Sequence, residues 1–124
     1  MSNQDTVALL ERFMAAWNAH DLEALLDFMT DDGIFHASVG PAPFGAMAVG
    51  RDALRRAYAA IWQTYPDAQW TKARHFASGD NACSEWIFIG TKADGTKIEV
   101  QGCDLFTLRG GKIAVKNSFR KQVA

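Results

Sequence analysis

The sequence predicts an α+β fold in which three N-terminal helices pack against the concave face of a strongly curved, mostly antiparallel sheet. Apolar residues recur at helical spacing up to about residue 65, and at every second position from Asp67 onward. Asp94-Gly95 and Gly110-Gly111 separate the later apolar runs, and both pairs are typical of two-residue hairpin turns. No linker or internal repeat divides the chain, so we expect a single domain, 1–124.

Three helices are expected in the first half of the chain. The first is predicted over about 5–19 by a stripe of Val7, Leu10, Met14 and Trp17. Asp21 is a suitable N-cap for a second, short helix, which we expect 31–33 (Asp-Asp-Gly) to end. The third is predicted over 51–65, because Pro66 cannot continue a helix.

The remaining segments are predicted as a short strand, a loop and four longer strands. Residues 34–37 have the composition of a short strand, and the Pro and Gly residues of 40–50 predict a loop at the rim of a pocket. The alternating runs predict strands over 68–77, 82–92, 97–109 and 112–122.

Composition excludes several classes of function. The chain has 13 Lys and Arg against 14 Asp and Glu, which argues against a nucleic-acid partner. No apolar run approaches the roughly 18 residues that span a bilayer, and the N-terminus has no signal pattern, so we expect a cytoplasmic protein. Cys83 and Cys103 are expected to be reduced core thiols rather than a disulfide. No side chains have metal-ligand spacing, and we expect neither a metal nor a cofactor.

A two-residue turn at Gly110-Gly111 would pair Asp104 with Asn117 on the apolar face that the helices cover. Lys116 and its alternate neighbours, Ser118 and Arg120, would then lie on the opposite face. A carboxylate on a covered face is costly unless it is paired, protonated or beside a cavity. Asp104 is therefore either a structural anchor or a functional acid. The face assignment depends on register, because one bulge would reverse it.

The Asp94-Gly95 turn leaves the neighbouring hairpin ambiguous. A two-residue turn would place Glu85 inside, opposite Asp104, and would leave Trp86 and Phe88 on the outer face. Either a bulge returns both rings to the inside, or the outer face is an interface between subunits. Glu85 remains a candidate site residue, with a strand-surface charge as the alternative.

Several motifs, in order along nearly the whole chain, resemble the nuclear-transport-factor-2-like superfamily. They are Phe13 to Leu22, Leu25 to Phe28, Asp31-Asp32, Gly50 to Leu54, Cys103 to Phe106 and Gly111 to Ile113. The resemblance implies a cone-shaped α+β barrel with an apolar pocket at its open end, commonly assembled as a homodimer through the outer sheet face. The superfamily includes ketosteroid isomerases, SnoaL-like polyketide cyclases and non-enzymatic domains.

The ketosteroid isomerase pattern is only partly present. The resemblance matches the protonated acid of the oxyanion hole to Asp104 and a supporting tyrosine to Tyr58. The tyrosine donor of the first helix is replaced by Phe13, and the proton-shuttling aspartate by Ala37, with His36 beside it. The chain is therefore not expected to be a standard ketosteroid isomerase.

The chain has eight Phe, four Trp and two Tyr, and Phe13, Trp17, Tyr58 and Trp62 fall on the helices expected to cover the apolar sheet face, which favours the wall of a small-molecule cavity. We expect a cofactor-independent isomerase, cyclase or dehydratase acting on a small apolar carbonyl compound or cyclic metabolite, with Asp104 and His36 as acid–base groups. The alternative is a non-catalytic ligand-binding or accessory dimerisation domain, with His36 as a loop-edge histidine. The predicted binding residues are Phe13, Trp17, Tyr58, Trp62, Glu85, Trp86, Phe106 and Asn117.

Overall fold

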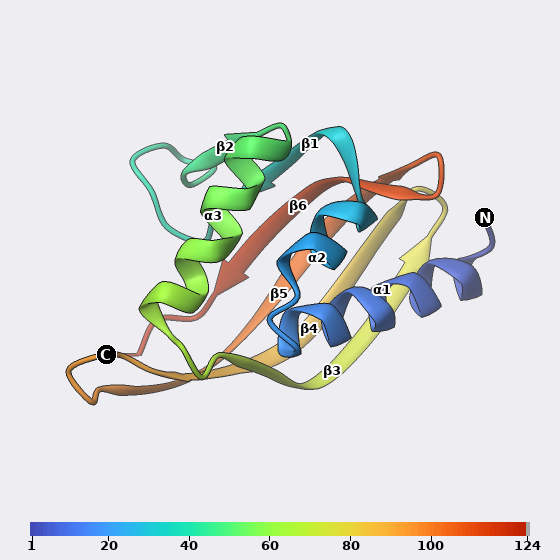
Figure 1. The fold of residues 1–124 in the computed structure, drawn as a ribbon. Coiled ribbons are helices and arrows are strands. Elements are labelled where there is room, and N and C mark those ends of the chain that lie inside the picture. The colour runs from blue at the N-terminus through green and yellow to red at the C-terminus, as the bar shows by residue number, and fades with distance from the viewer. Residues whose placement is uncertain (124) are drawn as a thin grey trace.

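The computed structural model describes residues 1–123 and has an α+β fold in which helices pack on a curved, unclosed sheet (Figure 1). The helices are α1 (Asn3–Asn18), α2 (Leu22–Phe28) and α3 (Arg51–Thr64). The strands are β1 (Met29–His36), β2 (Met47–Val49), β3 (Gln69–Ser78), β4 (Asn81–Thr91), β5 (Lys97–Arg109) and β6 (Lys112–Arg120). Their order in the sheet is β2-β1-β6-β5-β4-β3, and only β1 and β6 pair in parallel among the described strands. The predicted fold class is confirmed.

The helices begin at the caps that their sequences provide. The Ser2 hydroxyl accepts a hydrogen bond from the Asp5 backbone N–H at 3.0 Å, and the Asp5 carboxylate accepts one from the Ser2 N–H at 3.0 Å, which forms a capping box for α1. The Asp21 carboxylate caps α2 by accepting from the Ala24 N–H at 3.2 Å, as predicted. No helix within residues 1–123 is long and apolar enough to cross a membrane.

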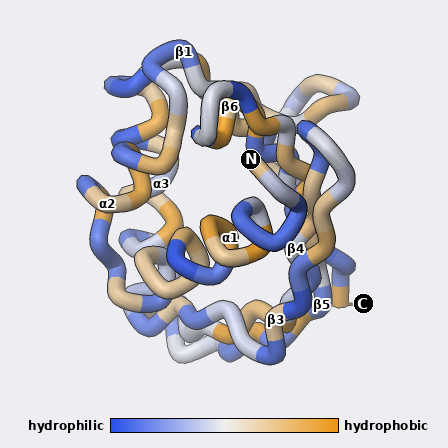
Figure 2. Tube along the Cα trace, turned by 90° about the vertical axis from the view of Figure 1, so that its right-hand side faces the viewer, coloured by the Kyte–Doolittle hydropathy of each residue, from blue (hydrophilic) through white to orange (hydrophobic). Residues whose placement is uncertain are grey.

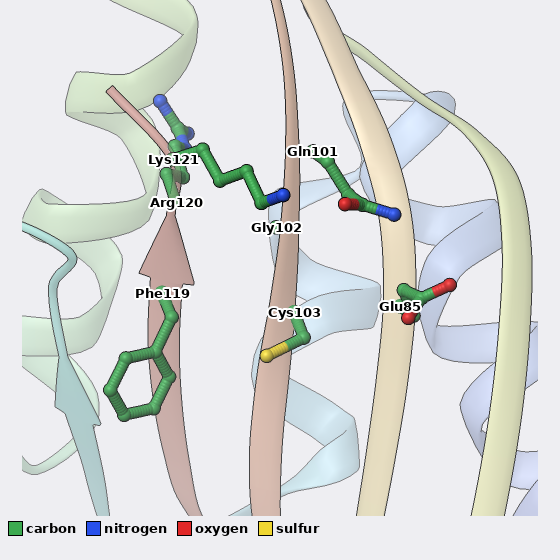
Figure 3. A pocket seen from close by; sticks show the side chains of 7 residues that line it. All are labelled: Glu85, Gln101, Gly102, Cys103, Phe119, Arg120 and Lys121. Atoms are coloured by element: carbon green, nitrogen blue, oxygen red, sulfur yellow. The ribbon is translucent and has the colours of Figure 1, made fainter. Parts of the chain in front are cut away.

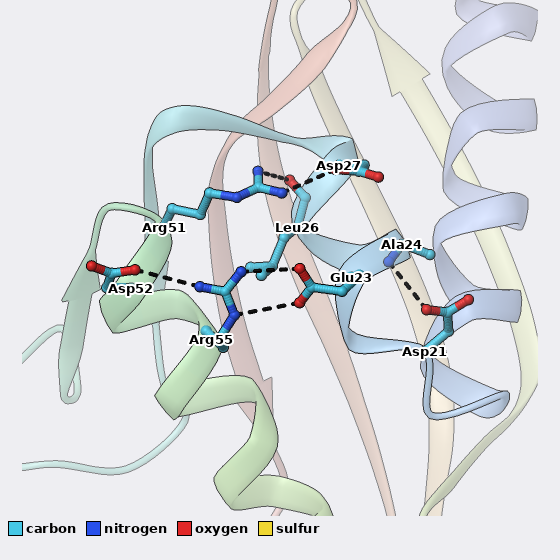
Figure 4. A network of polar contacts seen from close by, with 8 residues as sticks. All are labelled: Asp21, Glu23, Ala24, Leu26, Asp27, Arg51, Asp52 and Arg55. Carbon is cyan, nitrogen blue, oxygen red and sulfur yellow. Dashed lines mark hydrogen bonds and ion pairs between the residues drawn. The ribbon is translucent and has the colours of Figure 1, made fainter.

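Two ion pairs join α2 to α3 at the surface (Figure 4). The Arg55 guanidinium contacts both carboxylate oxygens of Glu23, at 3.0 and 3.3 Å. The Arg51 guanidinium lies 3.0 Å from the Asp27 carboxylate. Because these side chains are exposed, the pairs orient the two helices more than they stabilise the fold.

The core lies between the helices and the concave face of the sheet. In Figure 2, α1 lies within the curve of the strands, with α2 and α3 beside it. The side chains that close this space are almost fully buried and include Leu10, Phe13, Leu25, Leu26, Leu54, Tyr58 and Phe88. All three helices use the same face of the sheet, so the convex face remains uncovered.

Two boundaries near β1 differ from prediction. Helix α2 ends at Phe28, and residues 31–33 belong to β1, because Met29 already pairs with Ile113 of the parallel strand β6. The segment 40–50 is not entirely a loop, since β2 forms an antiparallel pair with β1 in it. This pairing provides hydrogen-bond partners for backbone N–H and C=O groups of β1 that would otherwise be unpaired at the edge of the sheet.

The β5–β6 hairpin follows the predicted register only next to its turn. Leu108 lies opposite Ile113 as predicted, but Thr107 lies opposite Val115, so Ala114 is an extra residue. This β-bulge reverses the faces of the rest of β6. Asp104 consequently lies opposite Ser118, and the predicted pairing of Asp104 with Asn117 is wrong.

The β4–β5 connection is longer than predicted. It spans residues 92–96 instead of two residues, and the Lys92 N–H and carbonyl bond to Thr96 and Gly95. The longer turn changes the register by one residue, so Glu85 lies opposite Cys103 on the convex face. Trp86 and its alternate neighbour Phe88 are buried on the concave face, as in the first of the two predicted alternatives, but the longer turn and not a bulge places them there.

Candidate functional site

A cavity of about 220 Å³ lies between α3, β1 and the concave face of the sheet. Its apolar walls are formed by Phe35, Ile61, Trp70 and Trp86, together with residues 37–39 and Ala57. Lys116, Ser118 and Arg120 supply its polar surface, because the bulge at Ala114 turns these three alternate residues of β6 inward.

Asp104 lies buried beside this cavity, with only 3% of its surface exposed. One carboxylate oxygen, Oδ2, accepts a hydrogen bond from the Trp86 indole N–H at 2.9 Å. The other, Oδ1, accepts from the Ser118 hydroxyl at 2.5 Å and lies 3.3 Å from the Lys116 ammonium. The donors to the carboxylate are thus an indole, a hydroxyl and an ammonium, and not the amide of Asn117 that was predicted to lie opposite it.

Gly102 provides the space that this arrangement requires. It lies opposite Trp86 on β4, and a Cβ added to it would lie 2.5 Å from the indole ring. The same Cβ would lie even closer to the Phe119 carbonyl oxygen, and real Cβ atoms do not approach other atoms so closely, so any larger residue would force the backbone or the indole ring to shift.

Lys116 is the second buried charge of the site. Its Nζ donates a hydrogen bond to the Ser118 hydroxyl oxygen at 2.9 Å and lies 4.5 Å from the centre of the Phe35 ring, with Trp17 and Tyr58 on its other sides. Burial lowers the pKa of the Lys116 ammonium, and the charge of Asp104 opposes this shift.

Tyr58 stays protonated at neutral pH, because burial and then the charge of Asp104 raise its pKa well above the ordinary value. Its hydroxyl is directed to the sulfur of Met29 at 3.5 Å, and it does not bond to Asp104. The supporting role that the resemblance implies for Tyr58 is therefore limited here to packing around Lys116.

Arg120 lies at the end of β6, where it lines the cavity. Its guanidinium carbon is 4.0 Å from the centre of the Phe88 ring, a cation–π contact with a fully buried ring. None of the ion pairs formed within residues 1–123 involves Arg120. Burial lowers the pKa of Arg120, although the group remains charged at neutral pH.

Most of the predicted aromatic wall belongs to the core. Phe13 packs edge-on against Phe28 and Phe106, and all three lie away from the cavity. Trp17 contacts Lys116 from the side of α1, and Trp62 stacks on His20 at 5.0 Å. Trp86 is the one predicted binding residue that lines the cavity in the described chain.

The remaining predicted site residues lie on the other face of the sheet. His36 pairs in register with Asn117, and both point away from the cavity, so the structure does not bring His36 and Asp104 together. Glu85 forms an ion pair with Arg74 at 3.1 Å. It also borders a shallow outer pocket with Cys103 (Figure 3).

The two cysteines are free but are not core residues as predicted. Cys83 and Cys103 are half-buried on the convex face, on neighbouring strands. Burial raises the pKa of the Cys83 thiol to about 11, so it is not a reactive thiolate at neutral pH.

Sequence reasoning missed Lys116, Ser118 and Arg120, which it placed on the outer face. One signal was available: three consecutive apolar residues, 113–115, interrupt the strict alternation of the strand. Such an interruption is compatible with a bulge, although it does not by itself show one.

The groups at the site are suited to proton transfer and hydrogen bonding. A carboxylate, a hydroxyl, an ammonium and an indole N–H lie in contact with one another. No three His, Cys, Asp or Glu side chains are grouped to hold a metal ion in the part of the chain that the structure describes. The chemistry that these residues themselves can supply is acid–base chemistry.

Comparison with known proteins gives a family match and several similar structures. The model of the SnoaL-like domain family matches residues 10–116. No curated protein matches the chain in sequence. A protein from Xanthomonas campestris pv. campestris, provisionally named a polyketide cyclase, is 21% identical, with a TM-score of 0.86 over 96% of this chain and 92% of its own.

Two further solved structures are similar. An NTF2-like protein of unknown function from Mesorhizobium loti is 28% identical, with a TM-score of 0.78 over 97% of this chain and 93% of its own. A protein from Catenulispora acidiphila DSM 44928 with a ketosteroid isomerase-like fold, in complex with trimethylamine, is 20% identical, with a TM-score of 0.79. That match covers 90% of this chain and 83% of the other. At these identities the neighbours establish the NTF2-like fold.

Proposed function

Because the chain belongs to the SnoaL-like domain family, we propose that it is a cofactor-independent enzyme of the isomerase, cyclase or dehydratase type. Its substrate is a small carbonyl compound or cyclic metabolite bound in the concave-face cavity. The observation that supports this most is the buried Asp104 carboxylate, bonded to two groups, Ser118 and Lys116, that line the cavity. The structural neighbour in complex with trimethylamine is a precedent for a small molecule on this fold.

In the proposed mechanism Asp104 acts through Ser118, because Asp104 itself does not line the cavity. The Ser118 oxygen takes a proton from a carbon next to the substrate carbonyl as its own proton passes to Asp104 over the 2.5 Å hydrogen bond. The Lys116 ammonium stabilises the negative charge that develops on the substrate oxygen. Reversal of these transfers returns the proton to another carbon or to a leaving hydroxyl group.

The size of the cavity limits the substrate. An apolar cavity of about 150 Å³ holds benzene, so the volume of about 220 Å³ suits one substituted ring. Phe35 and Trp86 lie on its walls and supply flat apolar surface for such a ring.

Hydrogen–deuterium exchange tests the proposal with simple probes. Acetophenone and cyclohex-2-enone are single-ring ketones whose α-hydrogens exchange when an enolate forms, and NMR in D₂O follows the loss of their signals. The wild-type protein should accelerate this exchange, and Ser118→Ala should reduce the acceleration at least about tenfold. Asn117→Ala, next to it on the opposite face, is the matched control and should retain the full rate.

Absence of exchange above the buffer rate with both ketones, or full exchange by the Ser118→Ala protein, would refute the catalytic proposal. One observation favours a non-catalytic binding module instead: both oxygens of Asp104 already accept hydrogen bonds. In that case the ketones would shift NMR signals of the cavity residues without any exchange.

A further inference from the structure

The cavity carries positive charge that its surroundings do not fully neutralise. Lys116 and Arg120 both line it, and none of its lining residues is an Asp or Glu. Asp104 lies 3.3 Å from the Lys116 ammonium and compensates that charge. Glu85, which lies on the convex face, is paired with Arg74. The charge of Asp104 also acts on Arg120, but one carboxylate faces two cations and Arg120 forms none of the ion pairs within residues 1–123, so the cavity keeps a net positive charge.

The position of Arg120 favours binding of an anion in one orientation. Its guanidinium carbon lies over the Phe88 ring, 4.0 Å from the ring centre, which holds the group at this end of the cavity. A guanidinium has five N–H donors in a fork that matches a carboxylate, and those of Arg120 contact no carboxylate within residues 1–123. A half-buried cation has lost part of its hydration, and a bidentate carboxylate partner restores those hydrogen bonds.

We propose that the ligand of this cavity is a single-ring compound that carries a carboxylate, which Arg120 binds. The ring occupies the apolar part between Phe35 and Trp86, and the carboxylate lies toward the end of β6. This inference rests on the proposed function in taking the cavity as the substrate site, and it adds the charge of the substrate. The Lys116 ammonium, already compensated by Asp104, remains available for the carbonyl oxygen.

Benzoate and benzamide test the inference directly, because they have nearly the same shape and differ by one charge. NMR titration should show that the wild-type protein binds benzoate at least about tenfold more tightly than benzamide. Arg120→Gln should abolish this preference, and Arg120→Lys should retain part of it because a charge remains without the bidentate geometry. Lys121→Gln is the matched control, since it removes the neighbouring exposed charge, and it should keep the preference.

Equal binding of benzoate and benzamide by the wild-type protein would overturn the inference, as would failure to bind either. Persistence of the preference in both Arg120 variants, with native circular dichroism, would also overturn it. If Lys121→Gln reduced the preference for benzoate as much as Arg120→Gln does, the preference would come from general surface charge, and the inference would again be overturned. The two proposals can fail separately. If the protein catalyses exchange of the neutral ketones but does not prefer benzoate, only the carboxylate proposal is refuted. If it prefers benzoate but catalyses no exchange, only the catalytic proposal is refuted.

Discussion

The buried Lys116–Asp104 ion pair determines how the substitution of a single residue at the site changes the stability of the protein. Both side chains are almost fully buried, with 7% of Lys116 and 4% of Asp104 exposed, so removing one charge leaves the other without its partner in a poorly hydrated space. Asp104→Asn should therefore lower the free energy of unfolding by about 3 kcal/mol, as measured by urea denaturation. Trp86 and Ser118 donate to different oxygens of Asp104, so an amide oxygen can keep only one of these hydrogen bonds, and the loss combines one hydrogen bond with the removal of the charge.

A double-mutant cycle separates this effect from simple loss of packing. Lys116→Met keeps most of the side-chain volume and removes the ammonium, so the double variant Asp104→Asn/Lys116→Met buries no unpaired charge. Its stability should exceed that of Asp104→Asn alone, because neutral replacement of a buried pair is often tolerated. Additive losses from the two substitutions would show that the pair contributes no coupling energy.

Among the helices and strands, the hairpins show which features of the fold could be predicted from the sequence and which could not. The two-residue period correctly assigned Asp104 to the concave face of β5, and the caps and Pro66 placed the helices within a few residues. The predicted face was wrong for β6 beyond Ala114 and was left open for β4, because the bulge at Ala114 and the longer 92–96 turn each shift the register by one residue. A shift of one residue moves every side chain of a strand to the other face.

The cavity itself could not be predicted from residue spacing. Phe13, Trp17 and Tyr58 do face the sheet, as their spacing on the helices requires. Whether such rings fill the core or border a cavity depends on how closely they pack with one another. Phe13 contacts Phe106 and Trp17 contacts Tyr58, which fills the space that the sequence suggested for a ligand.

The β3–β4 hairpin contains a group that couples its stability to pH. His75 is half-buried, with Nδ1 2.7 Å from the Ser84 hydroxyl, and burial lowers its pKa from 6.5, with Glu11 opposing the shift. The unfolded chain therefore binds this proton more readily, so stability falls as the pH drops below about 6.5. His75→Gln should reduce the change in unfolding free energy between about pH 7.5 and pH 5. An unchanged pH dependence would exclude His75 as a source of it.

At the scale of the whole molecule, the uncovered convex face presents an apolar surface. Four large side chains, one from each of β3 to β6, are between 37% and 48% exposed there: Phe76, Ile89, Leu105 and Phe119. Phe119 is seen beside the outer pocket in Figure 3. Such a surface across adjacent strands is typical of an interface, and a second copy of the chain would present the same residues.

We propose that the chain forms a homodimer through this convex face, and Leu105→Lys tests the proposal. Sedimentation of the wild-type protein at micromolar concentration should show a dimer, and the variant should be a monomer, because a buried lysine at the interface would lack a partner. Met47→Lys, at an equally exposed position on the edge strand β2, should remain dimeric. A monomeric wild-type protein, or a Leu105→Lys dimer, would refute the assignment. Leu105 and Arg120 lie on opposite faces, so the monomeric variant should still prefer benzoate to benzamide.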